Sequence, residues 1–453
     1  MADEALGRGS GQAAPGRVGR SAPVRVAIVG TGVAGLTAAH LLAREHDVTV
    51  YEADTRPGGH ANTVRVEDPR AGELWIDTGF IVLNDRNYPN FERLLEELGV
   101  ATQPAEMGLS IAEADGSFEF AGTRRGFLAQ PSNLVRPSFA RMIRDQLRFN
   151  REVRPLIGRA DSPSVAEFAR DSGYSREFLE RIIVPEISAV WSADPAGVWD
   201  FPVGFLAEFL HNHGQLELTG RPRWRTVVGG SRTYVGRIAR GLGNRLRLGA
   251  GVRRIERTAE GVLVAADGCE TEAFDEVVVA THSDQALAML ANPTVAERSV
   301  LGAIRYQPNE AALHTDPSPM PRRRRAWASW NFHLNPGADR ATMTYWMNNL
   351  QRIDAEHDYF VTLNRTDSID RGAIRAVIQY AHPVMDHAAV AAQRRWGEVS
   401  GADRIHYCGA YWRWGFHEDG CWSAIRSVSR LLESRPQPFE LPDVPGTPLE
   451  RAA

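Results

Sequence analysis

The 453-residue chain contains no lysine, so every formally positive side chain is one of its 52 arginines. A protein without lysine cannot form a lysine Schiff base, anchor pyridoxal phosphate through one, or use a lysine amine as an acid or base. A GC-rich coding sequence, which favours arginine, alanine, glycine and proline codons, is the simplest explanation of this composition. The absence still excludes all chemistry that depends on lysine.

Cysteine is also scarce. The three cysteines, Cys269, Cys408 and Cys421, are too few and too scattered for a disulfide framework or a metal site. They fit a reducing compartment, which predicts a cytoplasmic protein. The net charge of −4 indicates no polyanionic partner, so we expect no contact with nucleic acid.

The length allows a large core and predicts two domains. Residues 1–22, made mostly of Gly, Ala, Arg and Ser, and the Pro-rich residues 435–453 predict disordered tails. The uncharged run from Val26 to Ala43 could be read as a signal peptide or a membrane span. Its three closely spaced glycines and its abrupt change of hydrophobic period argue against both.

The stretch from Val24 to Glu52 reads as strand, glycine turn, helix and second strand. Gly30, Gly32 and Gly35 form G-x-G-x-x-G: the first permits a tight turn, the second lets a pyrophosphate approach the backbone, and the third lets helix and strand pack closely. Glu52 ends the second strand, at the spacing where a carboxylate accepts a hydrogen bond from a ribose hydroxyl. The stretch therefore predicts a dinucleotide-binding unit.

Two neighbouring features extend this unit. The helix that starts at Val33 and Ala34 should point its N-terminal N–H groups at the phosphates. After Glu52 comes an arginine followed by a Gly-Gly turn, which can place a cation and bare N–H groups beside the pyrophosphate. A simple turn is the alternative. The segment contains Arg56, Gly58, Gly59 and His60.

Beyond residue 87 the pattern becomes helical. Helices are predicted over about 88–98, 138–153, 175–191 and 201–213. Strand patterns return at residues 226–231, and the apolar run Glu276–His282 suits a strand buried on both faces. We therefore assign residues 23–87, 223–290 and 401–434 to the nucleotide-binding domain and residues 88–222 and 291–400 to a substrate-binding domain.

One predicted helix is basic on one face. Residues 138–153 place Arg141, Arg144, Arg148 and Arg151 opposite an apolar face. Such a face is usually only solvated, but a basic amphipathic helix can also rest on the inner face of an anionic membrane. We keep peripheral membrane contact as a hypothesis.

Aromatic residues are dense between Trp327 and Trp346. At this density they are more often core than pocket wall, although an enclosed apolar site would need such residues. The neighbouring run Arg322–Arg325 predicts an exposed loop.

The end of the chain repeats the anion-binding pattern. A strand from Ile405 leads into a glycine-punctuated loop, and a helix is predicted from Cys421 to Leu432. His417, Glu418 and Asp419 end that loop and include groups that can move protons. They could equally cap the last helix, and the sequence does not decide between the two roles.

Six sequence motifs together resemble those of a known family. They are VAIVGTGVAGLTAAHLL, RPGGHANT, IDTGFIVLN, VVGGSRTYV, VVVATHSDQAL and YCGAYWRWGFHEDG, spread over residues 24–432. Together they resemble the flavin-dependent amine oxidase and phytoene desaturase superfamily. Within it, the chain is similar to predicted NAD/FAD-binding oxidoreductases that look like the oxidase-like N-terminal region of plant cyclopropane fatty acid synthases.

The resemblance implies an α/β fold, with a Rossmann-type FAD-binding domain interleaved with an α+β substrate-binding domain. It implies FAD phosphates at the first glycine motif, the adenosine ribose at Glu52 and adenine at the backbone of Val252. The returning C-terminal segment would reach the ribityl chain and the flavin ring. The predicted cofactor-binding residues are Gly30, Gly32, Val33, Ala34, Gly35, Glu52, Arg56, Gly58, Gly59, His60, Val252, Gly409, Phe416 and Asp419. The catalytic residues stay unknown, with His417 and Glu418 as candidates.

Two departures from the family pattern bear on function. Amine oxidases of this superfamily typically place a lysine, through water, near the flavin N5 atom, and this chain has none. Neither Cys408 nor Cys421 stands where members with covalent flavin carry a cysteine, so we expect non-covalent FAD. The leading hypothesis is an oxidoreductase acting on an unsaturated or methyl-branched acyl lipid. The alternatives are an amine oxidase and a non-catalytic flavin-binding partner of a lipid methyltransferase.

Overall fold

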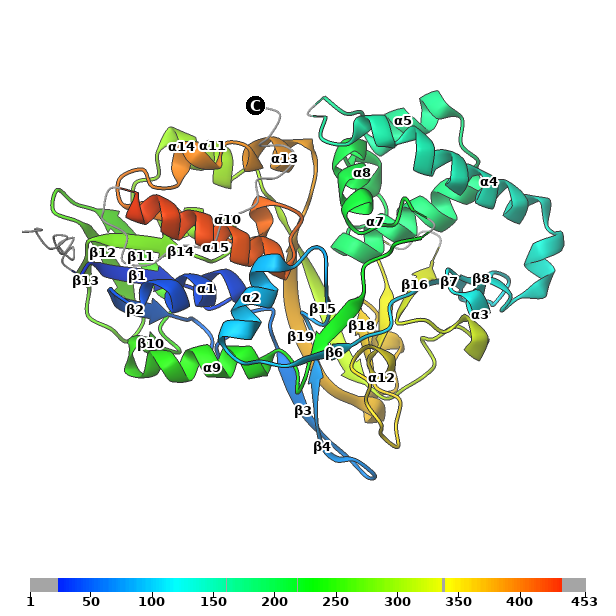
Figure 1. Cartoon of the computed structure of the whole chain (residues 1–453), viewed down its shortest axis with the longest axis horizontal. Coiled ribbons are helices and arrows are strands. Elements are labelled where there is room, and N and C mark those ends of the chain that lie inside the picture. Colours follow the sequence, from blue (N-terminus) through cyan, green and yellow to red (C-terminus); the bar gives the residue numbers. More distant parts are fainter. Residues whose placement is uncertain (1–22, 160, 218, 336–338, 434–453) are drawn as a thin grey trace, which may run out of the picture.

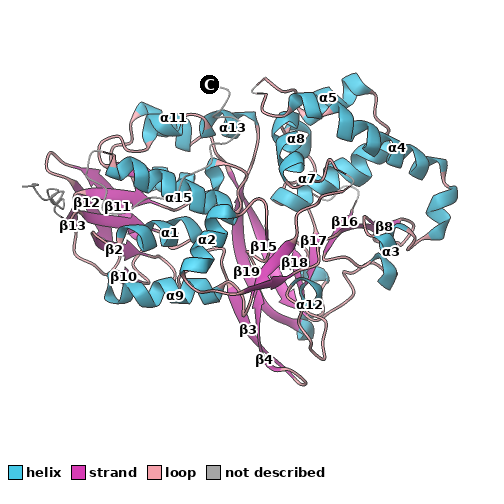
Figure 2. Cartoon of the chain, in the orientation of Figure 1, coloured by secondary structure: helices cyan, strands magenta, loops and turns pink. Residues whose placement is uncertain are grey.

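The computed structural model describes residues 23–159, 161–217, 219–335 and 339–433. The tails predicted for residues 1–22 and 435–453 lie outside these ranges. Figure 1 shows an α/β lobe on the left, a helical lobe at the upper right, and a long sheet between them. Figure 2 shows strands running through the middle of the molecule, with most of the right-hand lobe made of helices.

A five-stranded parallel sheet with the order β10-β2-β1-β14-β20 forms the centre of the left lobe. Its strands come from three separate parts of the chain, as predicted for a nucleotide fold that resumes after an insertion. Val277, Val278 and Val279 are fully buried in the inner strand β14, which confirms the apolar-run prediction. The strands are β1 (Arg25–Val29), β2 (Asp47–Tyr51), β10 (Leu246–Arg247), β14 (Glu276–Val279) and β20 (Ile405–Tyr407).

Helices cover both faces of this sheet. On one face, four helices share a buried cluster with the sheet: α1 (Val33–Leu42), α2 (Pro89–Glu97), α9 (Arg232–Leu242) and α15 (His417–Leu432). On the other face a second cluster joins the antiparallel sheet β11 (Val252–Arg257), β12 (Val262–Ala266) and β13 (Glu272–Phe274) to α10 (Ser283–Met289), α11 (Val295–Leu301), α13 (His387–Gln393) and α14 (Trp396–Val399). Packing therefore carries α2, α11, α13 and α14 into the nucleotide lobe, although the domain prediction placed their residues in the substrate domain.

The last helix begins at His417, four residues before the predicted start at Cys421. Two local features allow the earlier start. The Asp419 carboxylate accepts the backbone N–H of Phe416 at 2.8 Å, which caps the first turn. Gly420 has no side chain, and a Cβ there would lie 2.5 Å from Val33 Cγ1 on α1. The glycine that suggested a loop therefore serves close helix packing.

A seven-stranded mixed sheet joins the two lobes, with the order β19-β15-β18-β17-β16-β7-β8. The strands are β7 (Leu109–Glu113), β8 (Glu119–Ala121), β15 (Tyr306–His314), β16 (Trp330–Leu334), β17 (Met343–Trp346), β18 (Phe360–Leu363) and β19 (Ile374–Pro383). The helical lobe contains α3 (Arg124–Phe127), α4 (Pro137–Glu152), α5 (Val165–Ser172), α6 (Arg176–Phe178), α7 (Val184–Trp191) and α8 (Val203–Asn212). The predicted helix 175–191 is present but contains a π-helical turn at Leu179–Ile183.

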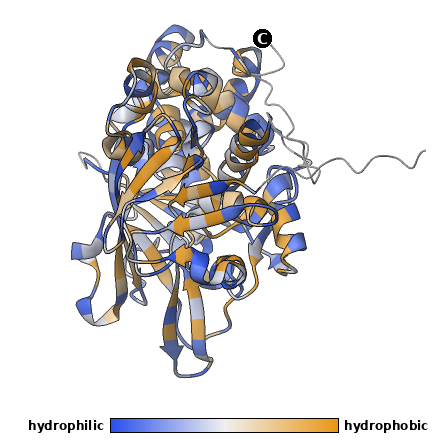
Figure 3. Cartoon of the chain, turned by 90° about the vertical axis from the view of Figure 1, so that its left-hand side faces the viewer, coloured by the Kyte–Doolittle hydropathy of each residue, from blue (hydrophilic) through white to orange (hydrophobic). Residues whose placement is uncertain are grey.

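Two small sheets connect these parts. β3 (Thr63–Asp68) and β4 (Gly72–Asp77) form a projecting hairpin, and β9 (Trp224–Val227) lies between β5 (Leu83–Asn84) and β6 (Thr102–Pro104). A short helix, α12 (Met347–Leu350), follows β17. Figure 3 shows hydrophobic and hydrophilic residues alternating along the helices and strands, as expected for elements that bury one face. In the described part of the chain, no helix has the length and hydropathy to cross a bilayer.

Candidate active site

The first glycine motif forms an open backbone cradle between β1 and α1. Gly30 has φ +98°, and a Cβ on Gly35 would lie 1.9 Å from the Gly30 carbonyl oxygen, so neither position accepts a side chain. A Cβ on Gly32 would meet no protein atom within 4 Å. No side chain caps the N-terminus of α1, where Val33 and Ala34 begin the helix. The first-turn N–H groups therefore stay available to an anion.

The second glycine turn lies over the first. Gly58 and Gly59 have φ +118° and +56°, and a Cβ on Gly59 would lie 3.2 Å from Gly32 Cα. The Gly58 N–H donates to Thr31 Oγ1 at 3.1 Å. Arg56 donates to the Gly59 carbonyl at 3.0 Å and lies 3.4 Å from Asp54. The predicted cation is thus beside the glycines, with part of its charge offset by Asp54.

Glu52 is held before any ligand binds. Its carboxylate accepts the Thr31 N–H at 2.9 Å, the Thr31 hydroxyl, and the Asp54 N–H at 2.9 Å. An ionised carboxylate has about four acceptor positions, so one remains for a ribose hydroxyl. The loop before Val252 joins this corner, because the Ala250 N–H donates to the Glu52 carbonyl at 2.8 Å. The structure therefore brings Val252 to the end of the site where the resemblance places adenine.

The C-terminal segment returns to the same cradle. Gly420 in the first turn of α15 packs against Val33 and Ala34 in the first turn of α1, so two helix N-termini lie side by side. Gly409 lies just after β20 and donates its N–H to Ser423 Oγ at 2.9 Å. This arrangement concentrates two positive helix ends at the place predicted for the phosphates.

Phe416 faces the helical lobe. Its ring stacks with that of Phe209 on α8 at 5.5 Å and lies 6.2 Å from the ring of His213. It therefore links the returning segment to α8, and it also packs against the buried cluster that includes Val33 and Ala34.

The two acidic residues that follow are engaged in the fold. Glu418 accepts the N–H groups of Asn90 and Phe91 and the Asn90 side-chain amide, so it caps the N-terminus of α2. Burial raises its pKa to about 7. Burial also raises the pKa of Asp419 to about 6, and Arg413 lies 3.7 Å away. Asp419 therefore caps the last helix, as one alternative predicted, whereas Glu418 caps α2 and not the last helix.

His417 is enclosed by aromatic rings. Its imidazole stacks on Phe80 at 3.5 Å between ring centroids, and its Nε2 lies 3.0 Å from the hydroxyl of Tyr234. Phe91 meets the ring edge-on at 5.3 Å. Burial holds the pKa of His417 well below its usual value, so the ring is neutral. It stays a candidate, although its hydrogen bond to Tyr234 already has a structural use.

A group of rings, of which the sequence indicated only His60, lies where the two lobes meet. We name His60, His282, Tyr306, Tyr380 and His382 the ring cluster. His60 lies 4.8 Å from Tyr380, 5.5 Å from His382 and 5.7 Å from His282 between ring centroids, and His282 stacks on Tyr306 at 4.3 Å. These residues come from the loops after β2 and β14 and from strands β15 and β19. No motif connects them, so only the folded chain reveals the group.

The ring cluster is neutral. Burial lowers the pKa of His60 and of His282 to about 4 and that of His382 to about 3. In the described part of the chain, no carboxylate lies within ion-pair distance of these three imidazoles. Other contacts fix two members: the Tyr380 hydroxyl bonds Thr78 and Asn62, and His382 Nδ1 accepts from Asn309.

Orphaned polar atoms provide a test of whether these residues fit a flavin. His60 Nε2 is buried without a hydrogen-bond partner, and so are Tyr411 Oη, Trp412 Nε1 and Trp414 Nε1 in the returning segment. Buried polar atoms normally have partners, and these come from the two segments assigned to the flavin. An isoalloxazine ring carries both acceptors and a donor that could satisfy such atoms. Together with the open Gly32 cradle, they fit FAD.

The family is established by comparison with known proteins. The model of the family described as flavin containing amine oxidoreductase matches residues 33–314. The chain belongs to this family of flavin-containing amine oxidoreductases. The match includes α1 with its following strand, the helical lobe and most of the ring cluster, which confirms the predicted superfamily and its flavin cofactor. The predicted likeness to plant cyclopropane fatty acid synthases stays a prediction.

Relatives agree with this family. The L-amino-acid oxidase of Siganus canaliculatus is 26% identical over 316 residues, 64% of this chain and 56% of that protein. The chain spans about half the length of the curated relatives it matches. Cyclohexylamine oxidase from Brevibacterium oxydans IH-35A has TM-score 0.65 at 16% identity, covering 91% of this chain and 99% of that one. The CLA-producing fatty acid isomerase from P. acnes has TM-score 0.63 at 14% identity, covering 90% and 98%.

These structural likenesses show the fold. They confirm a Rossmann-type FAD-binding domain interleaved with a substrate-binding domain. In this chain Cys408 and Cys421 are fully buried, and burial raises the pKa of both thiols. The aromatic residues between Trp327 and Trp346 have two different environments. Trp327 and Trp346 pack against the Arg324 guanidinium, whereas Phe332 is part of the hydrophobic core.

Proposed function

We propose that the chain is a FAD-dependent oxidoreductase that acts on a hydrophobic substrate, an unsaturated or methyl-branched acyl lipid. The neutral ring cluster carries this proposal. A site lined by uncharged imidazole and phenol rings suits an apolar chain, because no buried charge has to be paired. The cofactor is proposed to be non-covalent, since both cysteines near the returning segment are fully buried.

The same cluster offers an ammonium group the faces of its rings but no carboxylate partner. A buried cation requires a carboxylate or an equivalent partner, and none of the described carboxylates pairs with the cluster histidines. The chain also has no lysine to hold the water that amine oxidases of this superfamily place beside the flavin. Both features favour the oxidation of a carbon chain.

The chemistry divides between cofactor and protein. When bound, the flavin supplies a two-electron acceptor for hydride from a C–H bond. Loss of hydride from one carbon leaves a proton to be removed from its neighbour, which forms the double bond. A neutral imidazole of the ring cluster can accept that proton. Return of hydride to another carbon would instead move an existing double bond, and that needs no external oxidant.

The protein's other task is placement. Tyr380 is fixed by Thr78 and Asn62, and His382 is fixed by Asn309, so two rings of the cluster are oriented before substrate binds. Fixed groups that hold a C–H bond at the reacting position and exclude water lower the barrier through orientation. The fatty acid isomerase with the same fold indicates that the architecture is compatible with an acyl substrate.

An amine oxidase is the second candidate function. The family description and the L-amino-acid oxidase relative favour it. The third alternative is a flavin-binding partner of a lipid methyltransferase that does not turn over. The three differ in what reduces the bound flavin: a lipid, an amine, or neither.

Anaerobic mixing separates these candidates. The purified flavoprotein is mixed with unsaturated phospholipids, methyl-branched acyl lipids, primary amines or polyamines, while the flavin absorbance is followed in a stopped-flow instrument. We expect bleaching, or a shifted double bond on mass analysis, with an acyl lipid and no change with amines. Rapid bleaching by an amine with inert lipids would establish the second candidate. Photoreducible flavin that no substrate bleaches would support the third.

A further inference from the structure

Exposed apolar side chains gather on one short segment of the helical lobe. Phe127 is 36% exposed, Leu128 53%, Leu134 49% and Val135 83%. We name these four residues the apolar ridge. They lie at the end of α3 and just before α4, at the right-hand edge of Figure 1. Across the described residues only five other large apolar side chains are exposed: Leu147, Val228, Leu248, Val295 and Val377.

Positive charge surrounds the ridge. The sequence between Glu119 and Asp145 has no acidic residue and five arginines. A second acid-free stretch, between Asp316 and Asp339, contains Arg322–Arg325. The two stretches meet in the fold, because α3 packs against the short 3-10 turn Arg324–Ala326. The ridge therefore stands on a surface with a strong excess of arginine.

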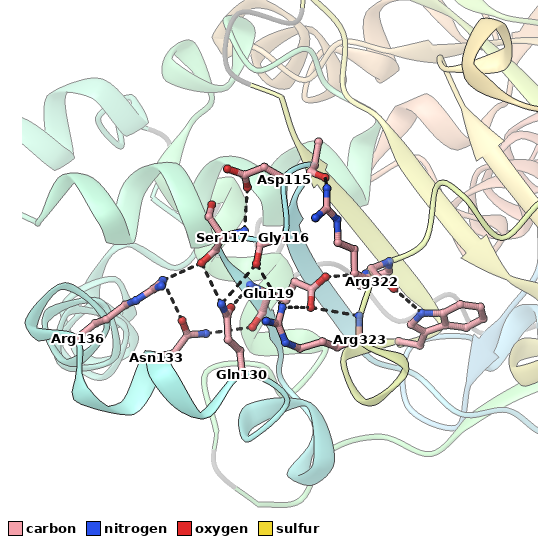
Figure 4. A network of polar contacts seen from close by, with 12 residues as sticks. Asp115, Gly116, Ser117, Glu119, Gln130, Asn133, Arg136, Arg322 and Arg323 are labelled. Atoms are coloured by element: carbon pink, nitrogen blue, oxygen red, sulfur yellow. Dashed lines mark hydrogen bonds and ion pairs between the residues drawn. The ribbon is translucent and has the colours of Figure 1, made fainter.

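A buried carboxylate fastens the two stretches together, as Figure 4 shows. Glu119 is almost fully buried and accepts the Arg322 N–H at 2.6 Å, the Arg323 N–H at 3.2 Å and the Arg323 guanidinium at 2.8 Å. Charge-assisted bonds of this kind are strong when water is excluded. Glu119 thus holds Arg322 and Arg323 next to the segment that bears the ridge.

The segment that bears the ridge is fixed to the same hairpin. Gln130 accepts the Glu119 N–H at 2.7 Å and donates to the Ser117 carbonyl at 3.1 Å. Asn133 donates to the Glu119 carbonyl at 3.1 Å, and Arg136 donates to the Ser117 carbonyl at 2.8 Å. Figure 4 shows these polar contacts between the segment and the hairpin, whereas the four ridge side chains are exposed to solvent. The apolar groups are therefore presented by an ordered scaffold.

The arginines of α4, predicted from sequence as the membrane-facing group, are largely paired within the protein. Arg141 bonds Glu177, Arg144 bonds Asp145, and Arg148 bonds Glu152. Arg125 and Arg325, beside the ridge, are exposed, and no carboxylate of the described residues lies within ion-pair distance of either. Of the four α4 arginines, Arg151 is exposed and has no ion pair with a described carboxylate. Available positive charge therefore lies at Arg125 and Arg325 beside the ridge and at Arg151 on α4.

We infer that the apolar ridge with Arg125 and Arg325 docks the protein on an anionic lipid bilayer. Apolar side chains enter the boundary between headgroups and acyl chains, while neighbouring arginines pair with anionic headgroups. A second copy of this chain fits less well, because a two-fold contact would set the same arginine-rich surface against itself. This inference concerns the outer surface and does not depend on the proposed reaction.

Vesicle co-sedimentation of the full-length flavoprotein tests the inference without turnover. The probes are phosphatidylcholine vesicles with and without phosphatidylglycerol, at low and high salt. We expect binding only to the phosphatidylglycerol vesicles, weakened by salt. The Arg125→Gln/Arg325→Gln variant should bind about 30-fold more weakly, since each basic residue near such a surface contributes about 1 kcal/mol, a factor of about five. Arg240→Gln/Arg371→Gln, which removes two exposed arginines elsewhere, should bind like the parent.

The apolar contribution has its own matched pair. Val135 and Val295 are both 83% exposed. Val135→Asp should lower vesicle binding at least about tenfold, because it removes an inserting group and adds a negative charge, whereas Val295→Asp should not. Equal binding of the two variants, or equal binding to neutral vesicles, would overturn the inference. So would a dimer in light scattering that Val135→Asp dissociates, because that would identify a second copy as the occupant.

Discussion

The interlobe site has two parts that differ in the groups that form them: main-chain atoms in one and side chains in the other. The nucleotide side is mostly backbone: glycines at positive φ, two uncapped or closely packed helix starts, and one carboxylate held by Thr31 and Asp54. Beside it lies the ring cluster, made of side chains from four separate segments. Positions with positive φ or close backbone contacts tolerate few residue types other than glycine. The side chains of a ring cluster can be exchanged for others without a change of backbone. Cofactor binding should therefore be the intolerant property and substrate choice the adaptable one.

The largest effect is expected on the backbone side. Gly32→Asp places a carboxylate where a Cβ meets no protein atom, so the variant should fold and yet exclude the pyrophosphate. We expect colourless protein with the melting temperature of the parent apoprotein. Gly241→Asp on α9 is the control, since that glycine is equally open and lies outside the cradle. Full flavin content in the Gly32 variant would show that the cofactor binds elsewhere.

The second-largest effect is expected from substitutions in the ring cluster. His282→Gln and His382→Gln should keep FAD, because neither residue belongs to the glycine cradle. At least one should slow anaerobic flavin reduction by the substrate by about 10²-fold or more, the usual contribution of a general base. Bound flavin per chain, measured by absorbance, is the internal control. Unchanged rates in both variants would remove the cluster from the chemistry.

The third prediction concerns the contribution of Glu52 to FAD binding. Glu52→Ala should weaken FAD binding by about 1.5–3 kcal/mol, the range for a hydrogen bond to a charged group. Titration of the apoprotein with FAD measures the dissociation constant, and Glu67→Ala on β3 serves as a distant exposed control. A dissociation constant that does not change would mean that the carboxylate only orders Thr31 and Asp54.

The smallest effect separates two roles for Glu418. If it caps α2, Glu418→Ala should lower the free energy of unfolding by about 1–2 kcal/mol, the usual cost of losing a cap. Urea denaturation provides that number. The rate of flavin reduction per bound flavin should stay the same. A normal stability with a large loss of rate would make Glu418 a catalytic residue after all.

The comparison also explains what the sequence could predict. The Gly30–Glu52 unit was predictable because each residue answers a backbone requirement at fixed spacing, and the fully buried β14 followed from its apolar run. The start of α15 was placed too late, since Gly420 suggested a turn. Its actual requirement, close packing on Val33, is a contact between residues far apart in sequence.

The ring cluster and the ion pairs of α4 could not be predicted either, because they also depend on contacts between residues far apart in sequence. His282 ends the apolar run that predicted a buried strand, and His382 lies in a strand that no motif marked. Only the pairing of the lobes brings both to His60. The α4 arginines formed a clear pattern, but their partners Glu177 and Asp145 could be seen only in the fold. Side-chain sites assembled across domains carry no local signature.

The pH dependence of the reductive half-reaction distinguishes a lipid substrate from an amine substrate. The anaerobic rate constant for flavin reduction is measured with an acyl lipid and with a primary amine, from about pH 6 to about pH 9. This range lies below the pKa of about 10.4 of a primary ammonium group, so the small neutral fraction of the amine rises about tenfold with each pH unit. Because the pKa values of His60, His282 and His382 lie at about 4, 4 and 3, the imidazoles stay neutral throughout. We predict reduction by the lipid at a rate that does not change above about pH 8, where Glu418 and Asp419, with pKa values of about 7 and about 6, have lost their protons, and no reduction by the amine. Reduction by the amine that rises with pH as its ammonium group loses a proton, with an inert lipid, would contradict this prediction.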